Sequence, residues 1–68
     1  MALDRTVIID GLIKHAEGHI AKHKTNVEVY LHNASGVGEH PDILDAIEKE
    51  LNIISTYHDQ IEILKTYF

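Results

Sequence analysis

The chain has 68 residues, enough for one small domain, and its formal net charge at pH 7 is -5. A core of this size leaves hydrophobic burial and conformational entropy nearly in balance, so the fold needs a further source of stability. The sequence has no cysteine and one methionine, which excludes disulfides and thiolate metal sites and leaves oligomerisation or histidine-based metal binding.

Charge and the first residues narrow the classes of partner. Eleven acidic residues against six Lys and Arg disfavour a general affinity for nucleic acid. The N-terminal stretch is interrupted by Asp4, Arg5 and Asp10, so it contains neither the apolar run of a signal peptide nor that of a membrane span. We therefore expect a cytoplasmic protein that binds neither nucleic acid nor a membrane.

A heptad pattern runs along the first half of the chain. Apolar or small residues recur in alternating steps of four and three, at Ile9, Ile13, Ala16, Ile20, Val27, Tyr30 and Ala34, and His23 fills the one gap. This stripe predicts a long helix over about residues 4–34. Asp4 is the expected N-terminal cap, with Thr6 as a competing cap.

A second stripe follows a short connection. It runs through Ile43, Leu44, Ile47, Leu51, Ile54, Ile61 and Phe68, with His58 in the gap, and predicts a helix over about residues 41–68. Gly36 suits the end of the first helix and Pro41 the start of the second, where Asp42 and Asp45 face the positive end of the helix dipole. A loop over about residues 35–40 then folds the helices into one antiparallel hairpin domain over residues 1–68.

The apolar arc of the second helix is wider than one neighbouring helix can cover. Further apolar residues lie to one side of the stripe, at Ala46, Ile53, Tyr57, Leu64 and Tyr67. We therefore expect an all-α protein whose hairpin dimerises into a four-helix bundle. The expected dimer interface comprises Ile47, Leu51, Ile54, Tyr57, Ile61, Leu64 and Phe68.

The histidines allow two interpretations. "HAEGHIAKH" spaces His15, His19 and His23 four residues apart. In the first interpretation His23 and His58 are polar positions in the seam that fix its register, while His15, His19 and His32 are solvated. Buried neutral histidines would then weaken the assembly below about pH 6.

The alternative is a metal site. A hairpin that turns near Val37 would place His58 between His15 and His19, with Asp59 at the same height. Imidazole ligands suit Zn, Cu, Ni or Fe. "HAEGH" lacks the Glu directly after the first His that zinc proteases use, and no Ser, His and carboxylate arrangement suggests a nucleophile. We therefore expect no enzyme and no cofactor.

Two glycines lie on the side of the first helix away from the predicted core. Gly11 and Gly18 each cost roughly 1 kcal/mol relative to alanine in a helix interior. They are either simply tolerated or allow another backbone to approach closely.

The stretches "HAEGHIAKHKTNVEVYLHN" and "GVGEHPDILDAIEKELNIISTYHDQIEILKTYF" resemble small uncharacterised helical proteins encoded by marine tailed phages, particularly those that infect cyanobacteria. The resemblance implies a phage accessory protein in the host cytoplasm, with a host protein as a further partner, and it carries over no functional residues. The sequence thus predicts a non-enzymatic, oligomerising interaction module, with a metal-binding or pH-responsive helical bundle as the alternative.

Overall fold

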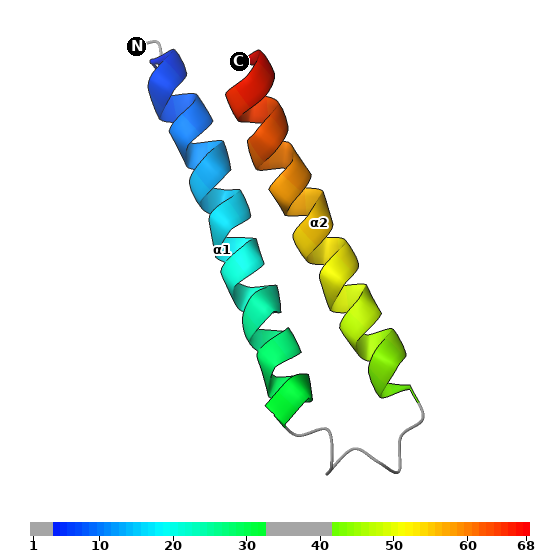
Figure 1. Cartoon of the computed structure of the whole chain (residues 1–68). Helices are drawn as coiled ribbons and strands as arrows, with labels where there is room; N and C mark the ends of the chain where they lie inside the picture. Colours follow the sequence, from blue (N-terminus) through cyan, green and yellow to red (C-terminus); the bar gives the residue numbers. More distant parts are fainter. Residues whose placement is uncertain (1–3, 33–41) are drawn as a thin grey trace.

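The computed structural model describes residues 4–32 and 42–68, which form two packed helices. Helix α1 spans Arg5–His32 and helix α2 spans Ile43–Tyr67. Figure 1 shows them side by side and antiparallel, with the start of α1 next to the end of α2. The predicted all-α hairpin is therefore confirmed, and the described residues contain no strand. The predicted loop over residues 35–40 lies outside the described residues.

The molecule is a thin rod with principal extents of 55 × 19 × 14 Å. Neither described helix has the length and apolar character that crossing a membrane requires. Dimerisation into a four-helix bundle stays a prediction, because the structure contains one chain.

The helix ends show which capping residues act. The Thr6 backbone N–H donates to Asp4 Oδ1 at 2.9 Å, which confirms Asp4 as the cap of α1. At α2 the Asp42 carbonyl accepts from the Ala46 N–H at 2.9 Å, but the Asp42 side chain makes no capping bond. The Arg5 guanidinium donates to the main-chain oxygen of Phe68, so this contact links the adjacent ends of the two helices.

An almost unbroken heptad seam joins the helices. On α1 its half-buried or buried positions include Ile9, Ile13, Ala16, Ile20, His23, Val27 and Tyr30, as the sequence predicted. On α2 they include Ile43, Ile47, Glu50, Ile54, Tyr57, Ile61 and Leu64. Of all described residues only Ala16 and Ile61 are buried, at 1% and 9% exposure. The rod therefore has a seam rather than an enclosed core.

Part of the predicted stripe on α2 is wrong. Leu51 is 49% exposed and His58 is exposed as well, because Glu50 and Tyr57 take the seam positions that the stripe assigned to them. Among the residues predicted for the dimer interface, Phe68 and Leu51 are exposed. The other five are half-buried or buried within one hairpin: Ile47, Ile54, Tyr57, Ile61 and Leu64.

Candidate functional site

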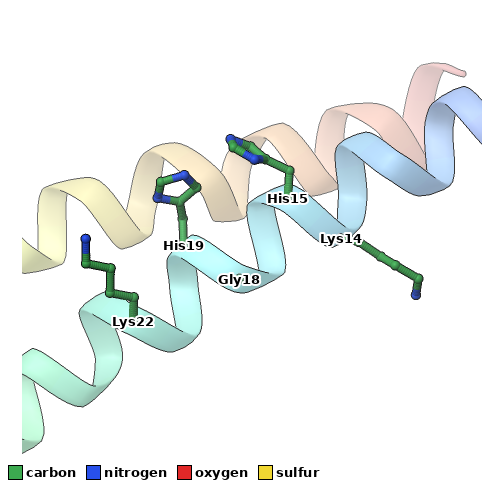
Figure 2. A pocket seen from close by; sticks show the side chains of 5 residues that line it. All are labelled: Lys14, His15, Gly18, His19 and Lys22. Atoms are coloured by element: carbon green, nitrogen blue, oxygen red, sulfur yellow. The ribbon is translucent and has the colours of Figure 1, made fainter.

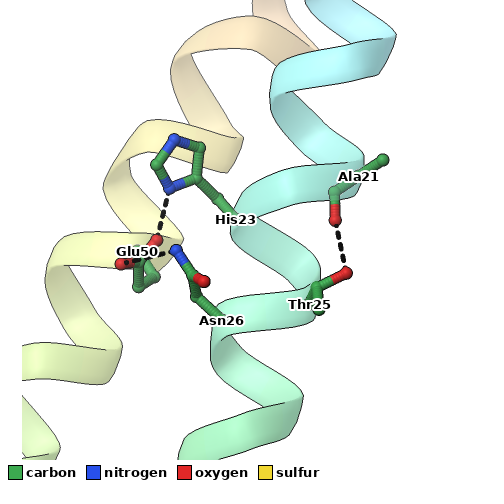
Figure 3. Close-up of polar contacts among 5 residues, drawn as sticks. All are labelled: Ala21, His23, Thr25, Asn26 and Glu50. Carbon is green, nitrogen blue, oxygen red and sulfur yellow. Dashed lines mark hydrogen bonds and ion pairs between the residues drawn. The ribbon is translucent and has the colours of Figure 1, made fainter.

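A polar cluster interrupts the apolar seam near its middle. His23 Nδ1–H donates to Glu50 Oε2, and Asn26 Nδ2 donates to Glu50 Oε1 at 3.2 Å (Figure 3). Since an ionised carboxylate is only an acceptor, the proton of this short contact is assigned to Nδ1 of His23. The side chains of His23 and Glu50 are only 14% and 16% exposed. The seam thus contains one satisfied pair from facing helices.

The cluster perturbs the acidity of its carboxylate. The hydrogen bond from His23 lowers the pKa of Glu50 below the usual 4.5, against the raising effect of burial, and Asn26 contributes further lowering. The sequence pattern predicted His23 as a polar residue of the seam, but it did not predict Glu50. Continuing the four-three spacing from Ile43 and Ile47 leads to Glu50, so the signal was present in the sequence.

Next along α1, three imidazoles and one phenol form a row of rings. The ring centroids of His15 and His19 are 4.5 Å apart with an interplanar angle of 68°. His19 stacks on Tyr57 of α2 at 4.4 Å and 5°, and Tyr57 also contacts His15 at 6.1 Å. The rings of His19 and His23 are 6.2 Å apart and nearly parallel. Tyr57 therefore occupies the place between His15 and His19 that was predicted for His58.

His58 lies away from these rings. It lines a shallow depression with Glu17, Lys24 and Glu62, among other residues. Because α2 turns Tyr57 rather than His58 toward α1, His58 is rotated by about 100° around α2 relative to the expected position. Among residues 4–32 and 42–68, no three His, Asp or Glu side chains gather as a metal site would require. The structure therefore does not bring His15, His19, His58 and Asp59 together.

The pair His15 and His19 borders a depression of about 330 Å³, which Lys14, Gly18 and Lys22 also line. Figure 2 shows both imidazoles leaving the same side of α1, whereas Lys14 points away from them. Lys14 Nζ instead lies 3.7 Å from Asp10 Oδ1. Burial is the main cause that lowers the pKa of His19 below the usual 6.5, and the neighbouring His15, His23 and Lys22 act in the same direction.

A second surface feature lies near the start of α1 and the end of α2. Leu12, Gln60, Ile63 and Leu64 line a groove of about 280 Å³ in which Gln60 is the one polar residue. Ile8 precedes Leu12 by one turn and Tyr67 follows Ile63 by one turn, so both extend the same side of their helices. We call this surface the terminal groove and define it by Ile8, Leu12, Gln60, Ile63, Leu64 and Tyr67.

The terminal groove is strongly exposed for an apolar surface. Its apolar residues Ile8, Leu12, Ile63 and Tyr67 are 48%, 52%, 49% and 74% exposed. By contrast, a Cβ built at Gly11 or Gly18 would meet nothing within 4 Å, so the side of α1 that carries them is open. The two helices thus leave one apolar groove and one sterically open side uncovered.

Comparison with known proteins identifies no relative: no protein-family model, curated protein or solved structure matches the chain. Function is therefore inferred from the side chains of the hairpin themselves.

Proposed function

We propose that this protein is an oligomerising interaction module in which two hairpins pack into a four-helix bundle. The observation that carries the proposal is the apolar surface that one hairpin leaves exposed: Ile8, Leu12, Ile63 and Tyr67 are 48%, 52%, 49% and 74% exposed. A second hairpin packed on this surface would remove it from water.

The shortage of buried residues supports the same conclusion. With only Ala16 and Ile61 buried among the described residues, little apolar surface offsets the conformational entropy of two helices of 28 and 25 residues. Ordering each residue costs about 1–2 kcal/mol for its backbone alone. A second copy adds apolar contacts without adding a different kind of chain, which is how most small oligomers form.

The terminal groove is the surface that a second copy fits best. It contains no charged side chain, so two chains of net charge -5 can meet there without placing like charges in contact. Leu12 and Ile63 line the groove and are about half exposed. The neighbouring Ile8 and Tyr67 are exposed apolar side chains that can enter the groove of the other copy. A twofold interface needs this combination, because each copy supplies both the groove and what enters it.

The test is the mass in solution by light scattering at several protein concentrations. We expect a dimer for the natural chain and a monomer for Leu12→Glu, because a carboxylate in the groove would be buried without a partner. Leu44→Glu is the matched control: Leu44 is 69% exposed outside the groove, so the dimer should persist. A monomeric natural chain, or a dimeric Leu12→Glu variant, would refute this interface.

Tyr57 also belongs to the dimer interface that the sequence predicts, but Tyr57→Glu is less suitable for this test. Tyr57 stacks on His19 within one hairpin, so its loss would disturb the seam as well as any dimer. A host protein as partner stays a prediction from the resemblance to phage proteins.

A further inference from the structure

We propose that His15 and His19 together chelate one divalent transition-metal ion of the class that prefers imidazole: Cu(II), Ni(II) or Zn(II). Residues four apart on a helix lie on the same side, one turn above the other. An ion about 2.0–2.1 Å from a nitrogen of each ring holds the two ring centres roughly 5 Å apart. The ring centroids of His15 and His19 are 4.5 Å apart, so the pair is close to this arrangement before any ion binds.

The structure selects this pair from the three evenly spaced histidines. His23 is held in the seam by Glu50, and its side chain is 14% exposed. Its ring is nearly parallel to that of His19 at a centroid distance of 6.2 Å. A metal ion lies in the plane of each ring that ligates it, and the rings of His19 and His23 are stacked. Their planes therefore do not meet at one ion. The planes of His15 and His19 are inclined at 68° and can converge.

Tyr57 acts as a positioning residue for His19. It stacks on the face of the imidazole at 4.4 Å and 5°. The lone pair that binds a metal lies in the plane of the imidazole ring, so stacking fixes the orientation of His19 without blocking its nitrogens. Helix α2 therefore contributes the orientation of a ligand that belongs to α1.

The surroundings of the pair indicate an open site of modest affinity. The depression beside the rings has a volume of about 330 Å³, and Gly18 contributes no side chain to it, so water can complete the coordination. Lys14 points away toward Asp10, but Lys22 lies on the same side as His19 (Figure 2). The positive charge of Lys22 opposes a cation. Affinities should follow the usual order, with Cu(II) above Ni(II) and Zn(II).

The experiment is calorimetric titration of the tag-free full chain with Ni(II) and with Cu(II). We expect one ion per chain and a loss of roughly tenfold or more in affinity for His15→Ala and for His19→Ala. The matched control is His32→Ala: His32 is also exposed on α1, and Glu28 rather than a second histidine lies beside it. Equal losses for His32→Ala and His15→Ala would overturn the proposal.

One further variant and one further measurement sharpen the test. Lys22→Ala should bind the ion more tightly than the natural chain, because it removes the opposing charge. Circular dichroism of His15→Ala, an exposed position, checks that the hairpin is intact when binding is lost. Unchanged affinity in His15→Ala with retained helix content would also overturn the site.

The site is independent of the proposed dimer, because both ligands come from one helix. The Leu12→Glu variant should therefore still bind one ion per chain, whatever its mass. Loss of binding in that variant while its helix content is retained would show that the ligands come from two chains and would overturn the proposal. A dimer that binds no metal would refute the chelate site and leave the dimer interface standing.

Discussion

His23 on α1 and Glu50 on α2 are hydrogen-bonded across the middle of an otherwise mostly apolar seam. Asn26, one turn farther along α1, donates to the other carboxylate oxygen of Glu50. A polar pair in this position costs desolvation, and its main benefit is that misaligned arrangements leave its members unpaired. We therefore interpret the pair as the element that sets the register of the hairpin.

Removing one member of this pair should destabilise the hairpin more than removing both. In His23→Leu the carboxylate of Glu50 loses its main partner, whereas the double variant His23→Leu with Glu50→Leu leaves an apolar layer. We expect the thermal midpoint, measured by circular dichroism, to be lower in the single variant than in the double variant. A double variant that melts at a lower temperature than the single variant would contradict this expectation.

Acid should weaken the hairpin through Glu50. The pKa of Glu50 is lower in the fold than the usual 4.5, so the unfolded chain binds more protons between these two values. The contribution of Glu50 is therefore complete above about pH 4.5 and is lost as the pH falls through the lowered pKa.

The comparison with Glu50→Gln isolates this effect from the other carboxylates. Thermal midpoints of the two proteins should differ most above about pH 4.5 and converge as the pH falls through the lowered pKa of Glu50. A difference that stays constant over this range would mean that ionisation of Glu50 contributes nothing to stability.

Alanine at Gly11 should stabilise the hairpin. The helix gains up to about 1 kcal/mol from the replacement, and the new Cβ meets no atom within 4 Å. Chemical denaturation followed by circular dichroism measures the gain, and Gly18→Ala serves as a second site. If either variant instead loses stability or changes its mass in solution, another backbone approaches this side of α1.

The cap of α1 should matter more than the corresponding residue of α2. Asp4→Ala removes the bond to the Thr6 N–H, and loss of such a cap costs about 1 kcal/mol. The matched variant is Asp42→Ala, because the Asp42 side chain makes no capping bond. Urea denaturation should therefore show a clearly larger loss for Asp4→Ala, and equal losses would contradict the assignment of the cap.

The periodicity of the sequence was sufficient to predict the two helices and their pairing. On α1 the apolar four-three pattern is interrupted only at His23, so the whole seam could be identified from the residues. On α2 two apolar stripes compete, and Leu51 and Glu50 are adjacent candidates for the same layer. Hydrophobicity favoured Leu51, but the carboxylate has a partner in His23 and the leucine is 49% exposed.

This choice of stripe also decided the prediction for the histidines. Because the other stripe of α2 faces the seam, Tyr57 instead of His58 lies beside His19, and a stacking partner stands where a third ligand was predicted. Helical spacing alone could show that His15 and His19 share a side. Helical spacing could not show that His23 is hydrogen-bonded to Glu50 and so is not a metal ligand. That hydrogen bond depends on how the two helices pack.

The seam also has a consequence for how copies of the chain can associate. Ala16 and Tyr30 lie seven residues before and after His23, so a slip of one heptad would place Glu50 against a layer without its partner. An α2 from a second molecule, aligned in the native register, would meet the same His23 and the same stacked His19. The seam therefore works equally well within one molecule and between two that exchange helices. Tethering in one chain favours the closed hairpin by an effective concentration of millimolar order, and a concentrated solution favours exchange.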